Sequence, residues 1–275
     1  MKKFNEENLR KLYVPPTSSN GEDNGQITII GGSELFHGSP IFSLKAASRI
    51  VDMVFFSSPE PRMGDIASKL KSQLSSFIWV PFGEVEEYIK KSDACLIGPG
   101  FMRFRSEGSG VDFDEAGEKS KKITERILAS FPDKKWVIDA GSLQVMEPEW
   151  IPEGAVLTPN KMEYARLFGD MAPNEAAEKY KCIVVLKGSV TTVCASGECF
   201  EVYGGNAGLT KGGTGDVQAG VTVGLLAKND PLLAAASASF LTKAAADSLY
   251  KRVSTMYNAD DLASEIPKMF GSNTP

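Results

Sequence analysis

A glycine-rich segment that ends in an aspartate carries the clearest chemical signal in the sequence. The segment, residues 206–216, reads NAGLTKGGTGD, and the apolar run that follows it at 217–227 predicts a helix. Gly212, Gly213 and Gly215 allow the backbone to turn tightly and to point its N–H groups outward, and a helix start adds partial positive charge at the same place. These residues predict a nest for phosphate oxygens that needs no basic patch.

Asp216 stands where this helix begins, and its position allows two interpretations. In the first, the carboxylate only caps the helix. In the second, it is a general base that takes a proton from a hydroxyl group as that group attacks a terminal phosphate. The glycine spacing fits neither the P-loop nor the dinucleotide-binding fingerprint. The segment therefore favours phosphoryl transfer to a hydroxyl group without a P-loop.

Glycine and polar residues also follow several apolar runs elsewhere in the chain. Ligands of open parallel sheets bind beyond the carboxyl ends of the strands, so turns at equivalent strand ends predict a shared crevice. Taken singly, each turn is explained as a plain connection between a strand and a helix. The turns occupy residues 31–33, 98–100, 139–142, 158–160 and 187–189.

Short apolar runs alternate with helical patterns from residue 26 onward, which predicts βαβ units, a mostly parallel sheet and an α/β fold. The runs lack polar alternation, so helices are expected on both faces of the sheet. The expected strands are 27–30, 53–56, 77–80, 94–97, 136–138, 155–157 and 183–186, with a hairpin at 191–194 and 199–203. The expected helices are 41–51, 65–74, 84–90, 113–131, 161–168, 216–227, 232–251 and 260–269.

The composition is that of a globular protein: 275 residues, of which 42% are hydrophobic and 24% charged. Residues 1–24 are polar and contain a Pro-Pro pair, so we expect an N-terminal arm ahead of a single domain at 25–275. A net charge of −5 makes nucleic acid and anionic membranes poor partners. The sequence shows neither a signal peptide nor a membrane-spanning stretch, which predicts a cytoplasmic protein.

The four cysteines are too few for a secreted disulfide scaffold. Cys95 and Cys182 lie within apolar runs and are expected in the core. Cys194 and Cys199 flank a turn, where they are plain hairpin residues, a redox pair or half of a metal site. Because His37 is the only histidine and no second Cys/His pair exists, the sequence predicts no zinc site.

The glycine-rich segment and the strand-end turns, in their order along the chain, resemble the ribokinase-like superfamily. The closer similarity is to the ATP- or ADP-dependent NAD(P)H-hydrate dehydratases, and it extends from Gly25 to Phe270. One such motif would be weak, whereas the ordered set is specific. The landmarks are IIGGS at 29–33, GSP at 38–40, IGPG at 97–100, VIDA at 137–140, LTPNKMEYARL at 157–167, LKG at 186–188 and GNAG at 205–208, continuing to Asp216.

The resemblance implies a three-layer ribokinase-like sandwich and a particular reaction. An adenine nucleotide, ATP or ADP, would phosphorylate the hydroxyl group of hydrated NADH or NADPH; phosphate would then leave and the reduced nicotinamide ring would return. Asp216 would deprotonate that hydroxyl group, and Mg²⁺ would bridge the nucleotide phosphates. No residue is expected to bind a metal by itself. Family members are often tetramers, so the resemblance also implies a homo-oligomer.

The resemblance further assigns residues to the two ligands. Those expected at the adenine nucleotide are Lys187, Gly188, Ser189, Val190, Thr191, Thr210, Lys211, Gly212, Gly213, Thr214 and Gly215. Those expected at the hydrated nicotinamide nucleotide are Ser39, Gly100, Asn160, Lys161, Met162, Glu163, Tyr164, Ala165, Arg166 and Asp216.

Three positions depart from the family's pattern. Gly141 stands where the family often has a second aspartate after Asp139, so a carboxylate that could contact metal or substrate is missing. Met102 replaces the last glycine of the Gly-Pro-Gly-Leu-Gly turn and brings a bulkier side chain to the crevice. Lys211 adds a charge to the anion-binding loop, where it either touches a phosphate or points to water.

Two other functions share much of this pattern. One is a kinase of the same fold that acts on a vitamin precursor with a free hydroxyl group. The other is a non-catalytic nucleotide-binding protein, which the departures permit. The turns at 98–100 and 158–160 favour the dehydratase over the kinase, and the intact residues 212–216 argue against a non-catalytic protein.

Overall fold

The computed structural model describes residues 1–104 and 115–271, and within them ten strands form one sheet. The strand order is β1-β10-β9-β8-β7-β6-β5-β2-β3-β4. Neighbours from β8 to β4 are parallel, whereas β9 is antiparallel to both of its neighbours. The predicted mostly parallel sheet is confirmed. The strands are β1 (Lys2–Lys3), β2 (Gln26–Ile30), β3 (Met53–Ser57), β4 (Ile78–Val80), β5 (Ala94–Ile97), β6 (Lys135–Ile138), β7 (Val156–Leu157), β8 (Ile183–Leu186), β9 (Thr191–Ala195) and β10 (Glu198–Val202).

Both faces of the central strands are buried. In β5, Ala94 and Leu96 belong to one hydrophobic cluster, and Cys95 and Ile97 belong to another. Successive side chains of a strand point to opposite faces, so the two clusters lie on the two sides of the sheet. Each cluster needs a cover of helices, which explains why the strand is a continuous apolar run.

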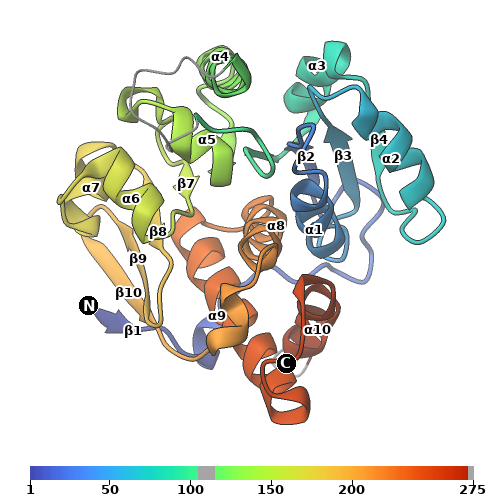
Figure 1. Ribbon diagram of the computed structural model, residues 1–275. Helices are drawn as coiled ribbons and strands as arrows, with labels where there is room; N and C mark the ends of the chain where they lie inside the picture. The colour runs from blue at the N-terminus through green and yellow to red at the C-terminus, as the bar shows by residue number, and fades with distance from the viewer. Residues whose placement is uncertain (105–114, 272–275) are drawn as a thin grey trace.

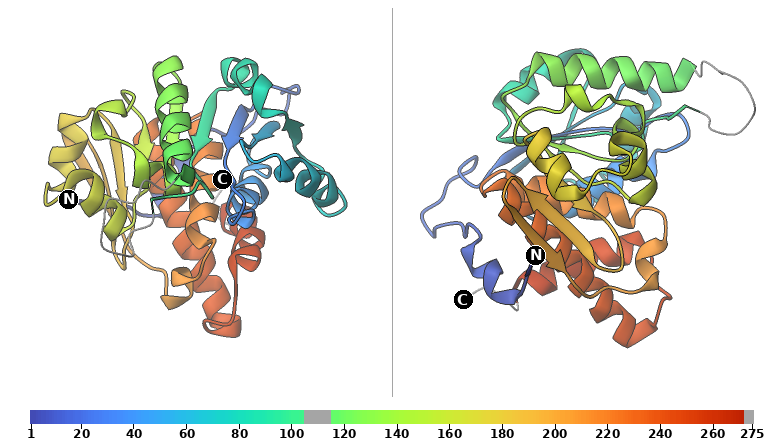
Figure 2. Two further views of the ribbon diagram at one scale, coloured as in Figure 1. Left: turned by 45° about the horizontal axis from the view of Figure 1, so that its top comes forward. Right: turned by 90° about the vertical axis from the view of Figure 1, so that its left-hand side faces the viewer.

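Two layers of helices provide this cover (Figure 1). In the right-hand view of Figure 2, α4 lies on one side of the strands and α8 to α10 lie on the other. The predicted three-layer arrangement is confirmed. The helices of the first cluster are α1 (Gly38–Ala47), α2 (Arg62–Leu70), α8 (Thr214–Leu226), α9 (Pro231–Val253) and α10 (Ala259–Gly271). Those of the second are α3 (Val85–Lys91), α4 (Glu115–Ser130), α5 (Ala140–Val145), α6 (Lys161–Phe168) and α7 (Pro173–Lys179).

Helices α1 and α8 pack closely enough for their backbones to meet. A Cβ at Gly220 would lie 2.3 Å from the carbonyl oxygen of Ser43, so only glycine fits at this crossing. The Ser43 hydroxyl also donates to the carbonyl oxygen of Asp216 at 2.8 Å. This packing fixes the N-terminal end of α8 beside the N-terminal end of α1.

The N-terminal segment is attached to the sheet. Strand β1 pairs in parallel with β10. Phe4 is only 2% exposed, and its ring meets the Phe200 ring edge-on with centroids 5.5 Å apart. Leu9 and Leu12 are also buried in the first cluster. The polar composition of residues 1–24 therefore conceals three apolar side chains that the sheet and α9 bury.

Some helix boundaries differ from the sequence prediction. Helix α1 begins at Gly38, three residues before the predicted start, and ends at Ala47. Pro40 lies in its first turn, where the missing N–H of proline costs no helical hydrogen bond. The sequence does not predict α5 and α7, because each spans less than two turns and offers no clear apolar period. The predicted start of a helix at 113 lies outside the described residues.

Cys194 and Cys199 face each other across the β9–β10 hairpin and form a disulfide, with their Cα atoms 4.2 Å apart. Of the three interpretations that the sequence allowed, the structure shows the one in which these two cysteines pair with each other. Cys95 and Cys182 are free and buried, as predicted, and burial raises the pKa of each thiol to about 12. Within the described ranges, no helix is long and apolar enough to cross a membrane.

Candidate active site

The glycine-rich segment forms the entrance to α8. Gly213 precedes the helix with a left-handed backbone, at a φ of +90°. A Cβ there would lie 2.5 Å from the Phe42 ring, so a side chain would not fit. The Thr214 hydroxyl donates to the carbonyl oxygens of Leu209 and Lys211 at 2.7 and 2.8 Å, which holds the loop against the helix. The first N–H groups of a helix have no partner within it, so those of α8 can face an anion.

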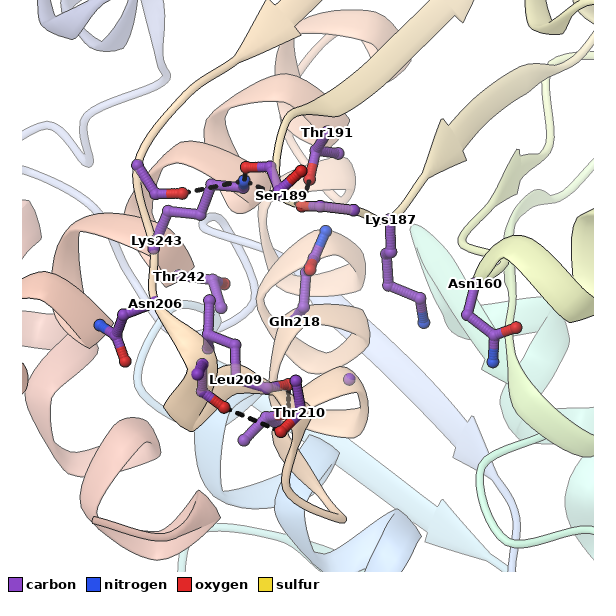
Figure 3. A pocket seen from close by; sticks show the side chains of 16 residues that line it. Asn160, Lys187, Ser189, Thr191, Asn206, Leu209, Thr210, Gln218, Thr242 and Lys243 are labelled. Atoms are coloured by element: carbon purple, nitrogen blue, oxygen red, sulfur yellow. Dashed lines mark hydrogen bonds between the residues drawn. The ribbon is translucent and has the colours of Figure 1, made fainter. Parts of the chain in front are cut away.

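A cavity of about 500 Å³ lies beside this loop (Figure 3). Its wall is formed by the β8–β9 turn, the loop after β10, the 3₁₀ helix η4 (Ala207–Thr210), the first turn of α8 and the middle of α9. This volume is within the range of small-molecule sites, about 300–1,000 Å³. The residues predicted for the nucleotide that line the wall are Lys187, Gly188, Ser189, Thr191, Thr210, Thr214 and Gly215. The residues predicted for it that lie outside the wall are Val190, Lys211, Gly212 and Gly213.

Lys211 turns away from this cavity. Its ammonium group donates to the carbonyl oxygen of Tyr257 at 2.6 Å and to that of Thr255. The charge lies 5.5 Å from the centre of the Tyr257 ring. In the structure, this lysine ties the anion-binding loop to the segment between α9 and α10, an arrangement that neither interpretation of its charge anticipated.

Asp216 belongs to a buried group of three carboxylates around one lysine. The Lys187 ammonium group donates to Oδ1 of Asp139 at 3.0 Å, and the Thr158 hydroxyl donates to the same oxygen at 2.7 Å. Asp139, Glu163 and Asp216 are all at most 9% exposed. The four charged side chains come from the ends of β6 and β8 and from the starts of α6 and α8. The crevice that the strand-end turns predicted therefore contains this charged group.

Burial and charge together shift the protonation of the group. Burial, reinforced by the negative charge of Asp139, raises the pKa of Asp216 to about 7, against the opposing effects of Lys187 and of a hydrogen bond from Ser39. Burial also raises the pKa of Glu163. Although burial opposes its charge, the carboxylates of Asp139 and Glu163 raise the pKa of Lys187. Asp216 thus titrates near neutral pH, which suits a general base.

Asn160 and Glu163 are fixed by their own helix. The Asn160 side chain accepts hydrogen bonds from the backbone N–H groups of Met162 and Glu163 at 2.9 and 3.0 Å, and Oε2 of Glu163 accepts the N–H of Asn160 at 2.8 Å. This reciprocal capping box starts α6. Gln144 donates to the other carboxylate oxygen of Glu163 at 3.0 Å. The local sequence alone therefore fixes both side chains at the start of α6, and the fold brings that helix end to the crevice.

The remaining residues of this segment do not share one environment. Tyr164 is buried in the second cluster, and its hydroxyl donates to the carbonyl oxygen of Met171 at 2.8 Å, so its side chain faces the core. The side chains of the other four residues predicted for the substrate are exposed, and they are Lys161, Met162, Ala165 and Arg166.

Gly100 and Ser39 lie together on the other side of the crevice. A Cβ at Gly100 would lie 2.4 Å from the carbonyl oxygen of Phe36, and the backbone at Gly100 has a φ of +75°. The loop before α1 therefore packs directly onto the Gly98–Gly100 turn. Ser39 follows in the first turn of α1, where its hydrogen bond with Asp216 lowers the pKa of that carboxyl group.

Two departures from the family's pattern meet in space. A Cβ at Gly141 would lie 2.3 Å from the carbonyl oxygen of Phe101. An aspartate at position 141 would therefore collide with the backbone of the turn that carries Phe101 and Met102. The position of the missing carboxylate therefore lies against the turn in which Met102 replaces glycine.

Several residues of the cavity wall carried no recognisable signal in the sequence. Lys243 lies in an alanine-rich helix, and Gln218 and Thr242 lie in apolar helical runs, so no motif marks them. Asn206 was part of a family landmark without an assigned role. Its side chain accepts hydrogen bonds from the N–H of Gly208 at 3.0 Å and from the Tyr257 hydroxyl at 2.8 Å, which fixes the loop that enters η4.

Solved structures with the same fold include two of special interest. A ribokinase-like superfamily protein from Enterococcus faecalis matches with a TM-score of 0.81 and 23% identity, over 99% of this chain and 96% of that one. The ADP/ATP-dependent NAD(P)H-hydrate dehydratase of Bacillus subtilis, co-crystallised with ATP/Mg²⁺, matches with a TM-score of 0.79 and 22% identity, over 99% and 98%. These likenesses confirm the predicted ribokinase-like fold.

Sequence comparison supplies closer relatives. An ADP-dependent (S)-NAD(P)H-hydrate dehydratase from Nitrosopumilus maritimus is 30% identical over 94% of this chain and 93% of its own. A bifunctional NAD(P)H-hydrate repair enzyme from Methanocaldococcus jannaschii is 31% identical over 95% of this chain, which spans about half (51%) of that protein. The family model described as NAD(P)H-hydrate dehydratase matches residues 27–268. The chain therefore belongs to the NAD(P)H-hydrate dehydratase family.

Proposed function

We propose that this protein is a nucleotide-dependent dehydratase that converts hydrated NADH or NADPH, in the S form, back to NADH or NADPH. The observation that carries the proposal is the buried carboxylate of Asp216, whose pKa burial raises to about 7 and which directly follows Gly215, a residue of the cavity wall. The family and the ADP-dependent relative of nearly equal length supply the substrate. Only the dehydratase activity is proposed, because the chain spans half of the bifunctional relatives.

Asp216 would act first. Its carboxylate accepts the proton of the ring hydroxyl group while that oxygen bonds to the terminal phosphorus of the nucleotide, and the bond from that phosphorus to the leaving nucleotide breaks. The N–H groups at the start of α8 stabilise the negative charge on the transferring group. Phosphate then departs with the electron pair of the C–O bond, and the neighbouring ring carbon loses a proton to water, which restores the double bond.

Lys187 and Asp139 would together adjust the pKa of Asp216, and with it the pH range in which this carboxylate can act as the base. The positive charge of Lys187 lowers the pKa of Asp216 and the negative charge of Asp139 raises it. The ion pair between them holds both groups in place. The result is a base that is largely ionised above neutral pH and still strong enough to accept a proton.

A magnesium ion fits this site only together with the nucleotide. Among the residues that the structure describes, no group of three or more His, Cys, Asp or Glu side chains could hold a metal by itself. Mg²⁺ commonly binds through substrate phosphates and one or two carboxylates. Asp216, which follows Gly215 of the cavity wall, and Glu163, whose carboxylate accepts the N–H of Asn160 at the same wall, are the residues that would supply them. When bound, the ion would neutralise phosphate charge.

The direct test is to incubate the purified protein with NADH hydrate, Mg²⁺ and either ADP or ATP. Recovery of the absorbance of reduced nicotinamide is expected with one or both nucleotides and not without them. The same reactions with Asp216→Asn protein provide the control for contaminating activity. No recovery with either nucleotide would contradict the proposal and would favour a vitamin-precursor kinase. Such a kinase would consume ATP when it is incubated with a hydroxylated heterocycle.

A further inference from the structure

Lys243 is a buried lysine that the proposed reaction does not use. It lies in the middle of α9, is 5% exposed and forms part of the cavity wall. Burying an ammonium group is costly unless hydrogen bonds satisfy it. The surroundings of this charge therefore bear on what it does for the site.

Three backbone carbonyl groups surround the Lys243 ammonium group (Figure 3). It donates to the carbonyl oxygens of Gly188 at 3.1 Å, Ser189 at 2.6 Å and Gly204 at 3.0 Å. A lysine ammonium group has three N–H bonds, so all of them are used. No donor is left for a phosphate, and a nucleotide in the cavity would meet the loops that Lys243 holds, not its charge.

The three carbonyl groups belong to two separate parts of the cavity wall. Gly188 and Ser189 lie in the turn between β8 and β9, whereas Gly204 lies in the loop after β10. That loop is also held by Asp247, one helical turn after Lys243 on the same face of α9. Its carboxylate accepts the N–H of Gly205 at 2.9 Å. Helix α9 thus holds this loop by two contacts: Lys243 donates to the carbonyl oxygen of Gly204, and Asp247 accepts the N–H of Gly205.

We propose that Lys243 is a positioning residue of the nucleotide site: it sets the separation between the β8–β9 turn and the loop at Gly204, the two walls between which the nucleotide binds. The expected effect on nucleotide binding rests on the proposed nucleotide site. The hydrogen bonds of Lys243 to the two loops are present without any ligand. The effect of Lys243 on these loops can therefore be tested separately from the reaction.

The first experiment measures nucleotide binding by calorimetry with AMP, ADP and ATP, each with Mg²⁺. Lys243→Met keeps the length of the side chain and removes the bridge, and Lys251→Met, exposed on the same helix, is the matched control. We expect Lys243→Met to weaken the binding of all three nucleotides by a similar factor, about tenfold. Lys251→Met should leave the three affinities unchanged. In the kinetics, a rise in KM for the nucleotide should account for most of the change in kcat/KM. A loss that grows with the number of phosphates would overturn the inference, because it would mean that Lys243 contacts phosphate.

The second experiment uses hydrogen exchange without nucleotide. In Lys243→Met, the amides of residues 188–190 and 203–206 should exchange faster, while those within α8 keep their original rates. If Lys243→Met does not fold, Lys243→Gln, which retains two N–H donors, should give the same pattern with smaller changes. Unchanged exchange in both segments of a folded variant would overturn the inference, even if the protein proved not to be a dehydratase.

Discussion

The ammonium group of Lys187 lies 3.0 Å from Oδ1 of Asp139, and this ion pair joins the end of β8 to the end of β6. Asp139 is 2% exposed, so its charge is scarcely screened by water. The charges of both members of the pair therefore act on the pKa of the neighbouring Asp216. The chemistry that we propose for Asp216 depends on this relationship.

Asp216→Asn should reduce turnover of hydrated NADH by about 10²–10⁴-fold, because an amide cannot accept the hydroxyl proton. Nucleotide binding should remain, since the N–H groups at the start of α8 are unchanged. Initial rates and calorimetric titration with ADP and ATP measure the two properties. Asp230→Asn, at the start of the neighbouring helix α9, keeps a capping side chain and should have no effect. Normal turnover by Asp216→Asn would show that another group is the base.

The pH dependence of kcat/KM should have an acid limb near the pKa of Asp216, about 7. Only the ionised carboxylate accepts a proton, so activity should fall as the pH decreases through this value. A pH–rate profile from about pH 5 to pH 9 measures the limb. A profile that stays flat down to the ordinary pKa of an aspartate would contradict the burial and charge that the structure gives to Asp216.

The same shift predicts how stability responds to removing the charge. The pKa of Asp216 is raised in the folded state, so the folded protein binds this proton more tightly than the unfolded chain, and its stability decreases as the pH rises toward 7. Asp216→Asn should therefore increase the melting temperature at about pH 8 and leave it nearly unchanged at about pH 4. An equal shift at both values would indicate a packing effect instead.

Lys187→Met should move the acid limb of the pH profile to higher pH, because the charge of Lys187 lowers the pKa of Asp216. It should also reduce the free energy of unfolding by about 3–5 kcal/mol, since it leaves the buried carboxylate of Asp139 without its partner. Denaturant unfolding measures this loss. Lys181→Met is the matched control: its exposed ion pair with Glu153 should contribute less than about 1 kcal/mol.

Gly141→Ala should destabilise the protein by about 1–3 kcal/mol, because its Cβ would lie 2.3 Å from the carbonyl oxygen of Phe101. Gly141→Asp, which restores the residue that the family often has, should be at least as destabilising. Gly83→Ala has no atom within 4 Å of the new methyl group and should be nearly neutral. Denaturant midpoints of the three variants compare them. A stable Gly141→Asp protein with raised activity would mean that the turn at Phe101 adapts.

Local sequence determined several parts of this protein. Helix α6 begins at the predicted residue because Asn160 and Glu163 cap one another within its first turn, and it ends at the predicted residue because Gly169 follows with a left-handed backbone. The continuous apolar runs predicted a sheet buried on both faces, because a strand that is covered on both sides needs apolar residues at successive positions. The glycines at 212–215 predicted the entrance to α8, because the left-handed backbone at Gly213 is available to glycine without strain.

Tertiary structure decided the rest. Asp139, Glu163, Lys187 and Asp216 lie far apart in the chain, and only the order of strands in the sheet brings their charges together. Phe4 looks like part of a polar arm until β1 pairs with β10. Lys243 has no motif, because its role depends on carbonyl groups that belong to other elements. Sequence patterns record contacts within a helix or turn, whereas these contacts form only when distant segments pack, and so no local pattern announces them.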